Sequence, residues 1–134
     1  MPLTDKQKRY YEILGERNRL RQERLSRARL SSEVKSVSSN KKWEKIFSTL
    51  QFELDSRDPA VVKLLKQEDP WEYNSILSSV FEESYLDGQS GPLKYSEIEW
   101  IEFPCVKLPA FNFEVDLEIG KGFVVIYGYR RNNS

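Results

Sequence analysis

The spacing of apolar residues changes once along this chain, and the change limits the folds open to it. Between residues 43 and 81, apolar side chains recur every three or four positions, as they do along an amphipathic helix. After the loop Gly88-Gln89-Ser90-Gly91-Pro92, apolar and polar residues alternate, as they do along a strand with one buried face. The pattern predicts an α+β fold, with N-terminal helices followed by a small antiparallel β-sheet with a C-terminal hairpin.

Two long helices are expected in the first half of the chain. Thr4 and Gln7 have the spacing of a capping box, and the helix that they begin can run to about Leu30. Asn40 is a suitable N-cap, and the apolar residues after it predict a second helix over about residues 41–54. Five serines between residues 31 and 39 indicate a linker between the two helices.

Two further helices are expected before the loop. Asp58-Pro59 and Asp69-Pro70 each place an N-cap residue before a proline at the first helical position. The first pair predicts a short helix over about residues 59–65. The second pair predicts a helix that ends near Leu86.

Three strands are expected after the loop, over residues 96–103, 111–119 and 123–127. Gly120-Lys121-Gly122 predicts a tight hairpin between the last two. Because the last strand is apolar throughout, we expect it to be central in the sheet and covered on both faces. Together with the helices, these segments predict a core of Trp43, Phe47, Leu50, Ile76, Val80, Phe81, Trp100, Val115, Leu117, Val125 and Ile126.

The charge of the chain is divided between its two ends. The protein is formally neutral, yet residues 1–42 carry a net charge of +7 and residues 43–134 carry −7. Apolar residues are sparse in the first forty residues, and the aromatic residues follow almost entirely after Lys42. We therefore expect a basic helical arm and serine-rich linker over residues 1–37, and an acidic α+β domain over residues 38–134 that folds by itself.

The composition argues against most enzyme chemistries. Histidine is absent, which removes the commonest general acid/base and the commonest transition-metal ligand. The single cysteine, Cys105, cannot form an intramolecular disulfide and makes a structural zinc site unexpected. We expect a protein that is not an enzyme and has no metal site and no cofactor. Since no run of apolar residues is long enough for a signal peptide or a membrane span, we expect a cytoplasmic protein without membrane contact.

Two rows of carboxylates are candidates for partner binding. Alternation places Glu97 and Glu99 on one face of the strand over residues 96–103, and Glu102 on the other. Paired carboxylates serve as acid and base in glycosidases or as cation ligands, although a one-sided sheet also produces them without any such role. The second row is Glu114, Asp116 and Glu118, on the polar face of the strand over residues 111–119. If the two rows lie side by side, they form one acidic surface that binds a basic protein, made of Glu97, Glu99, Glu114, Asp116 and Glu118.

Arg17, Arg21 and Arg24 form a row along one face of the first helix. Three interpretations of the arm are open. The row can dock on the acidic part of the same chain. It can bind nucleic acid through residues 6–29, since eight Lys and Arg residues fall between Lys6 and Arg27. Alternatively, the helix can oligomerise through Leu14, Leu20 and Leu25.

Three short motifs resemble a family of small, largely uncharacterised bacterial proteins. These motifs are the helix start Asn40-Lys41-Lys42-Trp43, the strand Ile98-Glu99-Trp100-Ile101-Glu102, and the terminal Ile126-Tyr127-Gly128-Tyr129. The resemblance covers about two-thirds of the chain, from Asn40 onward. It implies a bacterial, cytoplasmic α+β protein and supplies no activity.

The sequence thus favours a non-enzymatic binding protein of the immunity or inhibitor type. Its acidic sheet face would bind a basic protein partner, for example a nuclease toxin that must grip phosphates. The alternative is a nucleic-acid-binding regulator that acts through the basic N-terminal helix. Neither the identity of the partner nor the oligomeric state follows from the sequence.

Overall fold

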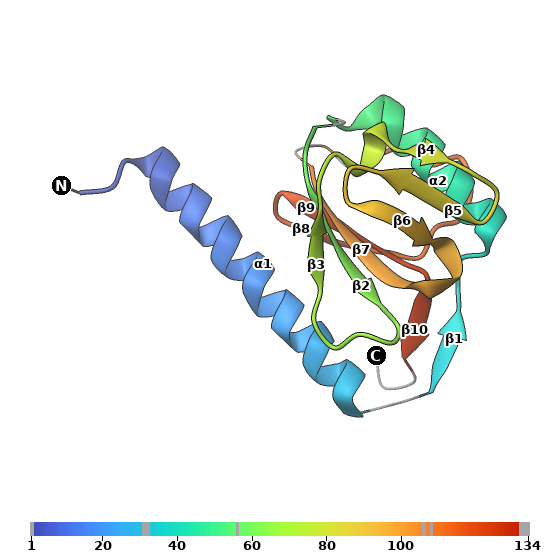
Figure 1. The fold of residues 1–134 in the computed structure, drawn as a ribbon. Coiled ribbons are helices and arrows are strands. Elements are labelled where there is room, and N and C mark those ends of the chain that lie inside the picture. Colours follow the sequence, from blue (N-terminus) through green and yellow to red (C-terminus); the bar gives the residue numbers. More distant parts are fainter. Residues whose placement is uncertain (1, 31–32, 56, 106, 108, 132–134) are drawn as a thin grey trace.

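The computed structural model describes residues 2–30, 33–55, 57–105, 107 and 109–131. A five-stranded antiparallel sheet forms the centre of the fold. The helix α1 (Asp5–Leu30) covers one face of this sheet, and the helix α2 (Asn40–Glu53) covers the other (Figure 1). The expected α+β class, with N-terminal helices followed by antiparallel strands, is confirmed.

Both long helices begin at side-chain caps. At the start of α1, the Thr4 backbone N–H donates to the Gln7 side chain and the Gln7 N–H donates to the Thr4 hydroxyl, which is the predicted capping box. At the start of α2, the cap is Ser39, whose hydroxyl accepts from the Lys42 N–H. The expected N-cap, Asn40, is therefore wrong by one residue and is instead the first residue of the helix.

The central sheet has the strand order β3-β2-β7-β9-β8, with every neighbouring pair antiparallel. Its strands are β2 (Ala60–Leu64), β3 (Trp71–Tyr73), β7 (Ile98–Pro104), β8 (Leu117–Gly120) and β9 (Phe123–Tyr127). All five residues of β9 are buried, so the expected inner strand with two covered faces is confirmed. The predicted hairpin joins β8 to β9, and Gly122 in its turn has a φ of +74°, which favours glycine.

Two smaller sheets flank the centre. β1 (Val34–Ser36) pairs with β10 (Tyr129–Arg131), so the segment before α2 is joined to the end of the chain. β4 (Val80–Phe81), β5 (Tyr85–Gly88) and β6 (Gly91–Lys94) form a three-stranded sheet. The single-turn helices η1 (Ile76–Ser78) and η2 (Tyr95–Glu97) precede β4 and β7.

The two shorter helices expected from the sequence are wrong. The segment after Asp58-Pro59 is β2, and the segment after Asp69-Pro70 contains β3, η1, β4 and the start of β5. Val61 and Val62 are β-branched, and their segment is stabilised as a strand by hydrogen bonds to β3 and β7 on its two sides. An aspartate followed by proline also begins turns, so the same dipeptide suits a loop that enters a strand.

The strand expected over residues 111–119 is shorter than its alternation suggested. Residues 111–116 are irregular, and β8 begins only at Leu117. Phe111, Phe113 and Val115 are half-buried against the core beneath α2.

Most of the predicted core is buried, on the two faces of the sheet. Trp43, Phe47, Leu50, Ile76 and Ile126 belong to the cluster beneath α2, while Trp100 and Val125 belong to the cluster beneath α1. Phe81, Val115 and Leu117 are only half-buried. Val80 is 63% exposed, so its place in the core is wrong; it lies on the outer face of the small sheet.

The serine-rich segment is more ordered than a linker. Ser31 and Ser32 lie outside the described residues, but residues 34–36 form β1. Ser38 is buried and donates a hydrogen bond from its hydroxyl to the Tyr127 carbonyl at 2.7 Å. The expected boundary between an arm over 1–37 and a domain over 38–134 stays a prediction. In the part of the chain that the structure describes, no helix has the length and apolar character needed to span a membrane.

Candidate functional site

The arginine row of α1 converges on one carboxylate of the sheet. Arg17 and Arg21 donate hydrogen bonds to Glu102 Oε1 at 2.9 and 2.8 Å, and Arg24 donates to Oε2 at 2.6 Å. Glu102 lies on β7 and its side chain is completely buried. Arginines on successive turns of α1 thus donate to one buried carboxylate, and this pairing compensates the free-energy cost of burying its charge.

The pKa values in this cluster reflect burial and pairing. Burial by itself raises the pKa of the Glu102 carboxyl, but the hydrogen bond and positive charge of Arg21, with Arg17 and Arg24, bring it below its ordinary value. Burial lowers the pKa of the Arg24 guanidinium, and Glu102 opposes that shift. Burial also raises the pKa of the Tyr127 hydroxyl, which donates to Glu118. The cluster is therefore ionised at Glu102 and neutral at Tyr127 at neutral pH.

A second buried carboxylate, Glu99, lies beside the first. Lys63 of β2 donates to Glu99 Oε1 at 3.1 Å, and Arg131 of β10 donates to the same oxygen at 2.7 Å. The side chains of Lys63 and Glu99 are 3% and 4% exposed. The Arg131–Glu99 ion pair joins the central sheet to the β1-β10 sheet.

The two carboxylates lie on the same face because β7 contains a bulge. Lys63 pairs with Trp100 and Leu64 pairs with Ile98, so Glu99 is an extra residue with no partner on β2. The bulge breaks the alternation, and Glu99, Trp100 and Glu102 all belong to the α1 side of the sheet. The expectation that Glu99 and Glu102 lie on opposite faces is therefore wrong.

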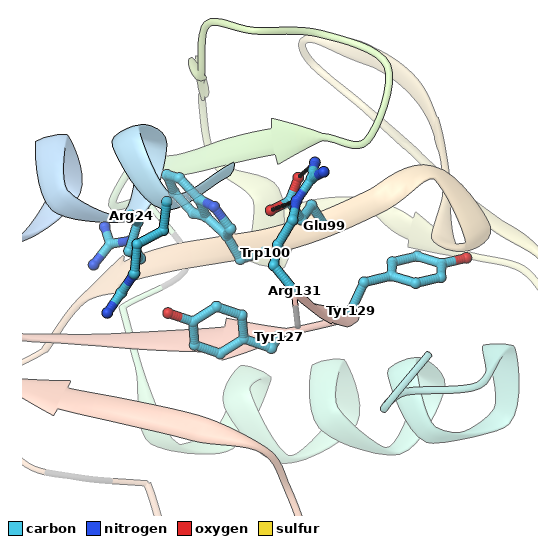
Figure 2. A pocket seen from close by; sticks show the side chains of 7 residues that line it. Arg24, Glu99, Trp100, Tyr127, Tyr129 and Arg131 are labelled. Carbon is cyan, nitrogen blue, oxygen red and sulfur yellow. Dashed lines mark hydrogen bonds and ion pairs between the residues drawn. The ribbon is translucent and has the colours of Figure 1, made fainter. Parts of the chain in front are cut away.

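Figure 2 shows the seam between α1 and the sheet around Trp100. The Arg24 guanidinium lies 4.5 Å from the Trp100 ring centroid, which is the geometry of a cation–π contact. Among the described residues, Arg24 Nε and Nη1 have no hydrogen-bond partner. The cavity here measures about 10 Å³ and is lined by Glu99, Tyr127, Tyr129 and Arg131 among others. It has room for about one water molecule and none for a substrate.

Gly128 carries the chain past this seam between β9 and β10. A Cβ at this position would lie 2.2 Å from the Ile98 carbonyl oxygen, so only glycine fits. Its N–H donates to the Glu99 carbonyl at 2.8 Å, and its own carbonyl accepts from the Val37 N–H at 2.9 Å. The Tyr-Gly-Tyr motif thus has a steric explanation in this fold.

The predicted acidic surface is only partly accessible. Glu97, in η2, and Glu114 are exposed. Asp116 is half-buried and accepts from Arg130 at 2.9 and 2.6 Å, and Glu118 accepts from the Tyr127 hydroxyl. Glu99 is internal and cannot touch a partner. The structure therefore brings Asp116 and Glu118 together at the end of the chain, and it removes Glu99 from the set.

The small sheet carries an exposed patch that the sequence did not reveal. Val80 and Tyr85 are 63% and 40% exposed, and Glu82, Glu83 and Asp87 are exposed beside them. Val80 lies directly opposite Asp87 across β4 and β5, and Glu82 and Glu83 form the turn between the two strands. We call these five residues the small-sheet patch. The signal that was available was the glycine-rich segment Gly88-Gln89-Ser90-Gly91, in which Gln89 and Ser90 form the turn of the hairpin that joins β5 to β6.

The described part of the chain contains one cysteine, Cys105, and no histidine. There, no group of three His, Cys, Asp or Glu residues has the geometry to hold a metal ion. Burial raises the pKa of the half-buried Cys105 thiol, which disfavours the reactive thiolate form.

No family model, curated protein or solved structure matches this chain. The resemblance to small bacterial proteins drawn from three motifs stays a prediction.

Proposed function

We propose that this chain is a non-enzymatic binding protein of the immunity or inhibitor type, and that its partner is a basic protein. The observation that carries the proposal is the small-sheet patch, which combines exposed apolar side chains with three carboxylates. A tyrosine among charged residues is a common anchor of protein interfaces, and the surrounding carboxylates guide an oppositely charged partner.

The distribution of charge supports a basic partner. The arginine row of α1 is used inside the protein, because all three side chains bind Glu102. Between residues 33 and 131, twelve exposed acidic residues stand against eight exposed basic ones. The surface of the sheet and loops is therefore negative, and it attracts positive partners over distances up to the Debye length, about 8 Å at physiological salt.

The acids predicted from the sequence have a secondary place in the proposal. Glu97 and Glu114 are accessible, and Asp116 and Glu118 are partly so, but each of the last two already holds an internal hydrogen bond. A partner that competed for Asp116 would have to displace Arg130. The small-sheet patch carries no such internal bonds from its three carboxylates to other described side chains.

The alternative function is nucleic-acid binding by the start of α1. Lys6, Lys8 and Arg9 are exposed there, with Tyr10 and Tyr11 available for stacking. Against it, the three arginines that made the helix attractive as a phosphate-binding surface are turned toward Glu102. Five of the eight basic residues between Lys6 and Arg27 remain, and Arg19 among them pairs with Glu23, so the electrostatic term is weaker than that of eight.

Charge reversal tests the proposal. The full-length protein is used to capture a partner from its native host, and association rates are then measured by surface plasmon resonance. Reversal of Glu82, Glu83 and Asp87 to lysine should slow association about tenfold or more and weaken its salt dependence. The matched control reverses Glu68 and Asp69 on the β2–β3 connection and Glu72 on β3, which are exposed and change the net charge equally.

Three results would count against this surface or this partner class. Equal effects of the two triple reversals would leave only net charge as the cause. A strong effect of Glu114→Lys with Glu118→Lys alone would move the interface to the end of the chain. Salt-dependent binding of labelled single-stranded DNA or RNA that is lost in Lys6→Glu with Lys8→Glu would favour the nucleic-acid alternative.

A further inference from the structure

The N-terminal turns of α1 extend beyond the sheet that the rest of the helix covers. A helix of 26 residues is about 39 Å long, whereas five strands spaced about 4.8 Å apart span only roughly 20–24 Å. Residues 2–12 are all exposed, and the first half-buried side chain of the helix is Ile13. Figure 1 shows this end of α1 pointing away from the body of the protein. We call residues 2–12 the overhang.

The overhang carries an unusual share of exposed apolar surface. The side chains of Leu3, Tyr10 and Tyr11 are 46%, 59% and 57% exposed. Eight large hydrophobic residues are exposed in the described part of the chain, and these are three of them. A helix end of this length gains little stability in water without packing. Something that covers these side chains would therefore stabilise both the helix and the contact.

A groove runs between the overhang and the body. Tyr10, Ile13 and Leu14 form its helical wall, and Leu54 and Pro104 form part of the opposite wall. Its volume is about 460 Å³. Glu53, Asp55 and Asp58 lie along it; Asp55 also pairs with Arg57, while the basic groups in the groove are Arg17, which binds Glu102, and Lys107.

We propose that the occupant of this groove is the overhang of a second copy of the chain. The overhang supplies Lys6, Lys8 and Arg9, which complement the carboxylates of the groove, and its tyrosines complement the apolar wall. In a two-fold arrangement each copy gives its overhang and receives the other, so both contacts are made at once. The two helices run antiparallel, with Tyr10 of each near the Ile13 and Leu14 wall of the other.

The size of the contact sets the expected affinity. Four tyrosine rings, two from each copy, bury on the order of 600–1,000 Å². That area belongs to the weak end of specific interfaces, so we expect a reversible dimer with a dissociation constant on the order of 10 µM.

Sedimentation velocity on the full-length protein tests the proposal, at concentrations from about 1 µM to about 500 µM, which bracket the expected constant. The wild type should shift from monomer to dimer across this range. Tyr10→Ser with Tyr11→Ser should weaken the dimer at least tenfold. Val34→Ser, at an exposed apolar residue on β1 that belongs neither to the groove nor to the small-sheet patch, is the matched control and should leave it unchanged.

A charge exchange makes the test specific for the groove. Lys6→Glu with Lys8→Glu should weaken the dimer, and so should Glu53→Lys with Asp58→Lys. The four changes together should restore it, because opposite charges then face each other again. Circular dichroism checks that each variant is folded.

Two results would overturn the proposal. One is a wild-type protein that stays monomeric at every concentration. The other is a dimer that is insensitive to the tyrosine and charge changes, which would place the contact elsewhere on the surface.

Discussion

The two faces of the central sheet are covered by helices that bury different kinds of side chain. Beneath α2 the contact is aromatic and aliphatic: Phe47 stacks on Trp43 at 5.5 Å and on Phe81 at 4.9 Å between ring centroids. Beneath α1 the contact centres on the Glu102 carboxylate and its three arginines, and the helix also contributes Leu25, which is buried.

The two contacts differ in how strictly they fix the position of the helix on the sheet. An apolar contact accepts many small displacements at modest cost, since dispersion and the hydrophobic effect have little direction. The buried Glu102 carboxylate, which accepts from Arg17, Arg21 and Arg24 together, does not tolerate such displacements. A shift of α1 by one turn would leave charges unpaired. We infer that the α2 side supplies most of the stability and the α1 side fixes the position of its helix.

Removal of residues 1–37 is the largest test of this comparison. It uncovers Trp100, Phe123, Val125 and Tyr127, so we expect a loss on the order of 5 kcal/mol in the free energy of unfolding. Since the cluster beneath α2 remains, a chain that begins at Ser38 should still show one cooperative thermal transition at a lower temperature. Absence of any transition in calorimetry would show that the α1 side is part of a single indivisible core.

The substitution Glu102→Gln should cost about 3–5 kcal/mol, because it leaves three arginines without their buried counter-charge. Urea denaturation at neutral pH measures the loss. The matched control is Glu23→Gln, which breaks the exposed pair with Arg19 and should cost at most about 0.5 kcal/mol. A cost for Glu102→Gln below about 1 kcal/mol would mean that the seam does not depend on its charges.

The substitution Ile126→Ala probes the other face through the same strand. Ile126 is completely buried beneath α2, and its truncation should cost roughly 2–5 kcal/mol. Val125→Ala, one residue earlier and on the α1 side, removes two side-chain carbons where Ile126→Ala removes three, and it should cost less. The reverse order in denaturant unfolding would contradict the view that the α2 side dominates stability.

Acid should weaken the α1 side selectively, with the smallest effect of the four. The pKa of Glu102 is lower in the folded chain than its ordinary value of 4.5, so its ionised form stabilises the fold fully above about 4.5. That contribution is lost as the pH falls through the folded value. Unfolding free energies measured between pH 7 and about pH 3 should therefore fall more in the wild type than in Glu102→Gln. Parallel curves would show that other carboxylates account for the acid sensitivity.

The parts of the fold that were predictable are those with long or strict patterns. The capping box of α1, the apolar spacing of α2 and the Gly120-Lys121-Gly122 turn each depend on residues close in sequence. The two helices predicted between Ala60 and Leu86 are wrong, because the apolar spacing of this region fits short strands as well as helices. Tyr73, Ile76 and Leu77 are indeed buried, but they are held by β3 and a single turn of 3₁₀-helix rather than by a continuous helix.

The candidate sites show the same limit. Helical spacing grouped Arg17, Arg21 and Arg24 correctly on one face, yet nothing local identifies Glu102 as their partner. The bulge that turns Glu99 inward depends on pairing between β7 and β2, which lie far apart in sequence. The sequence does not predict the small-sheet patch, because the apolar spacing of its segment indicates a helix that ends near Leu86. These features depend on contacts between residues far apart in sequence, and the periodicity of a single segment does not identify those contacts.

The contacts of α1 have a consequence for the order of synthesis. Its three arginines are separated from Glu102 by 78 to 85 residues, and β1 must wait for β10 at the very end of the chain. The helix α1 leaves the ribosome before the strands that it packs on, and it therefore has no place to dock until β7 and β9 have followed. Closure of so long a loop slows folding. During that interval a basic helix is accessible to chaperones and proteases, because α1 is made well before the residues that hold it.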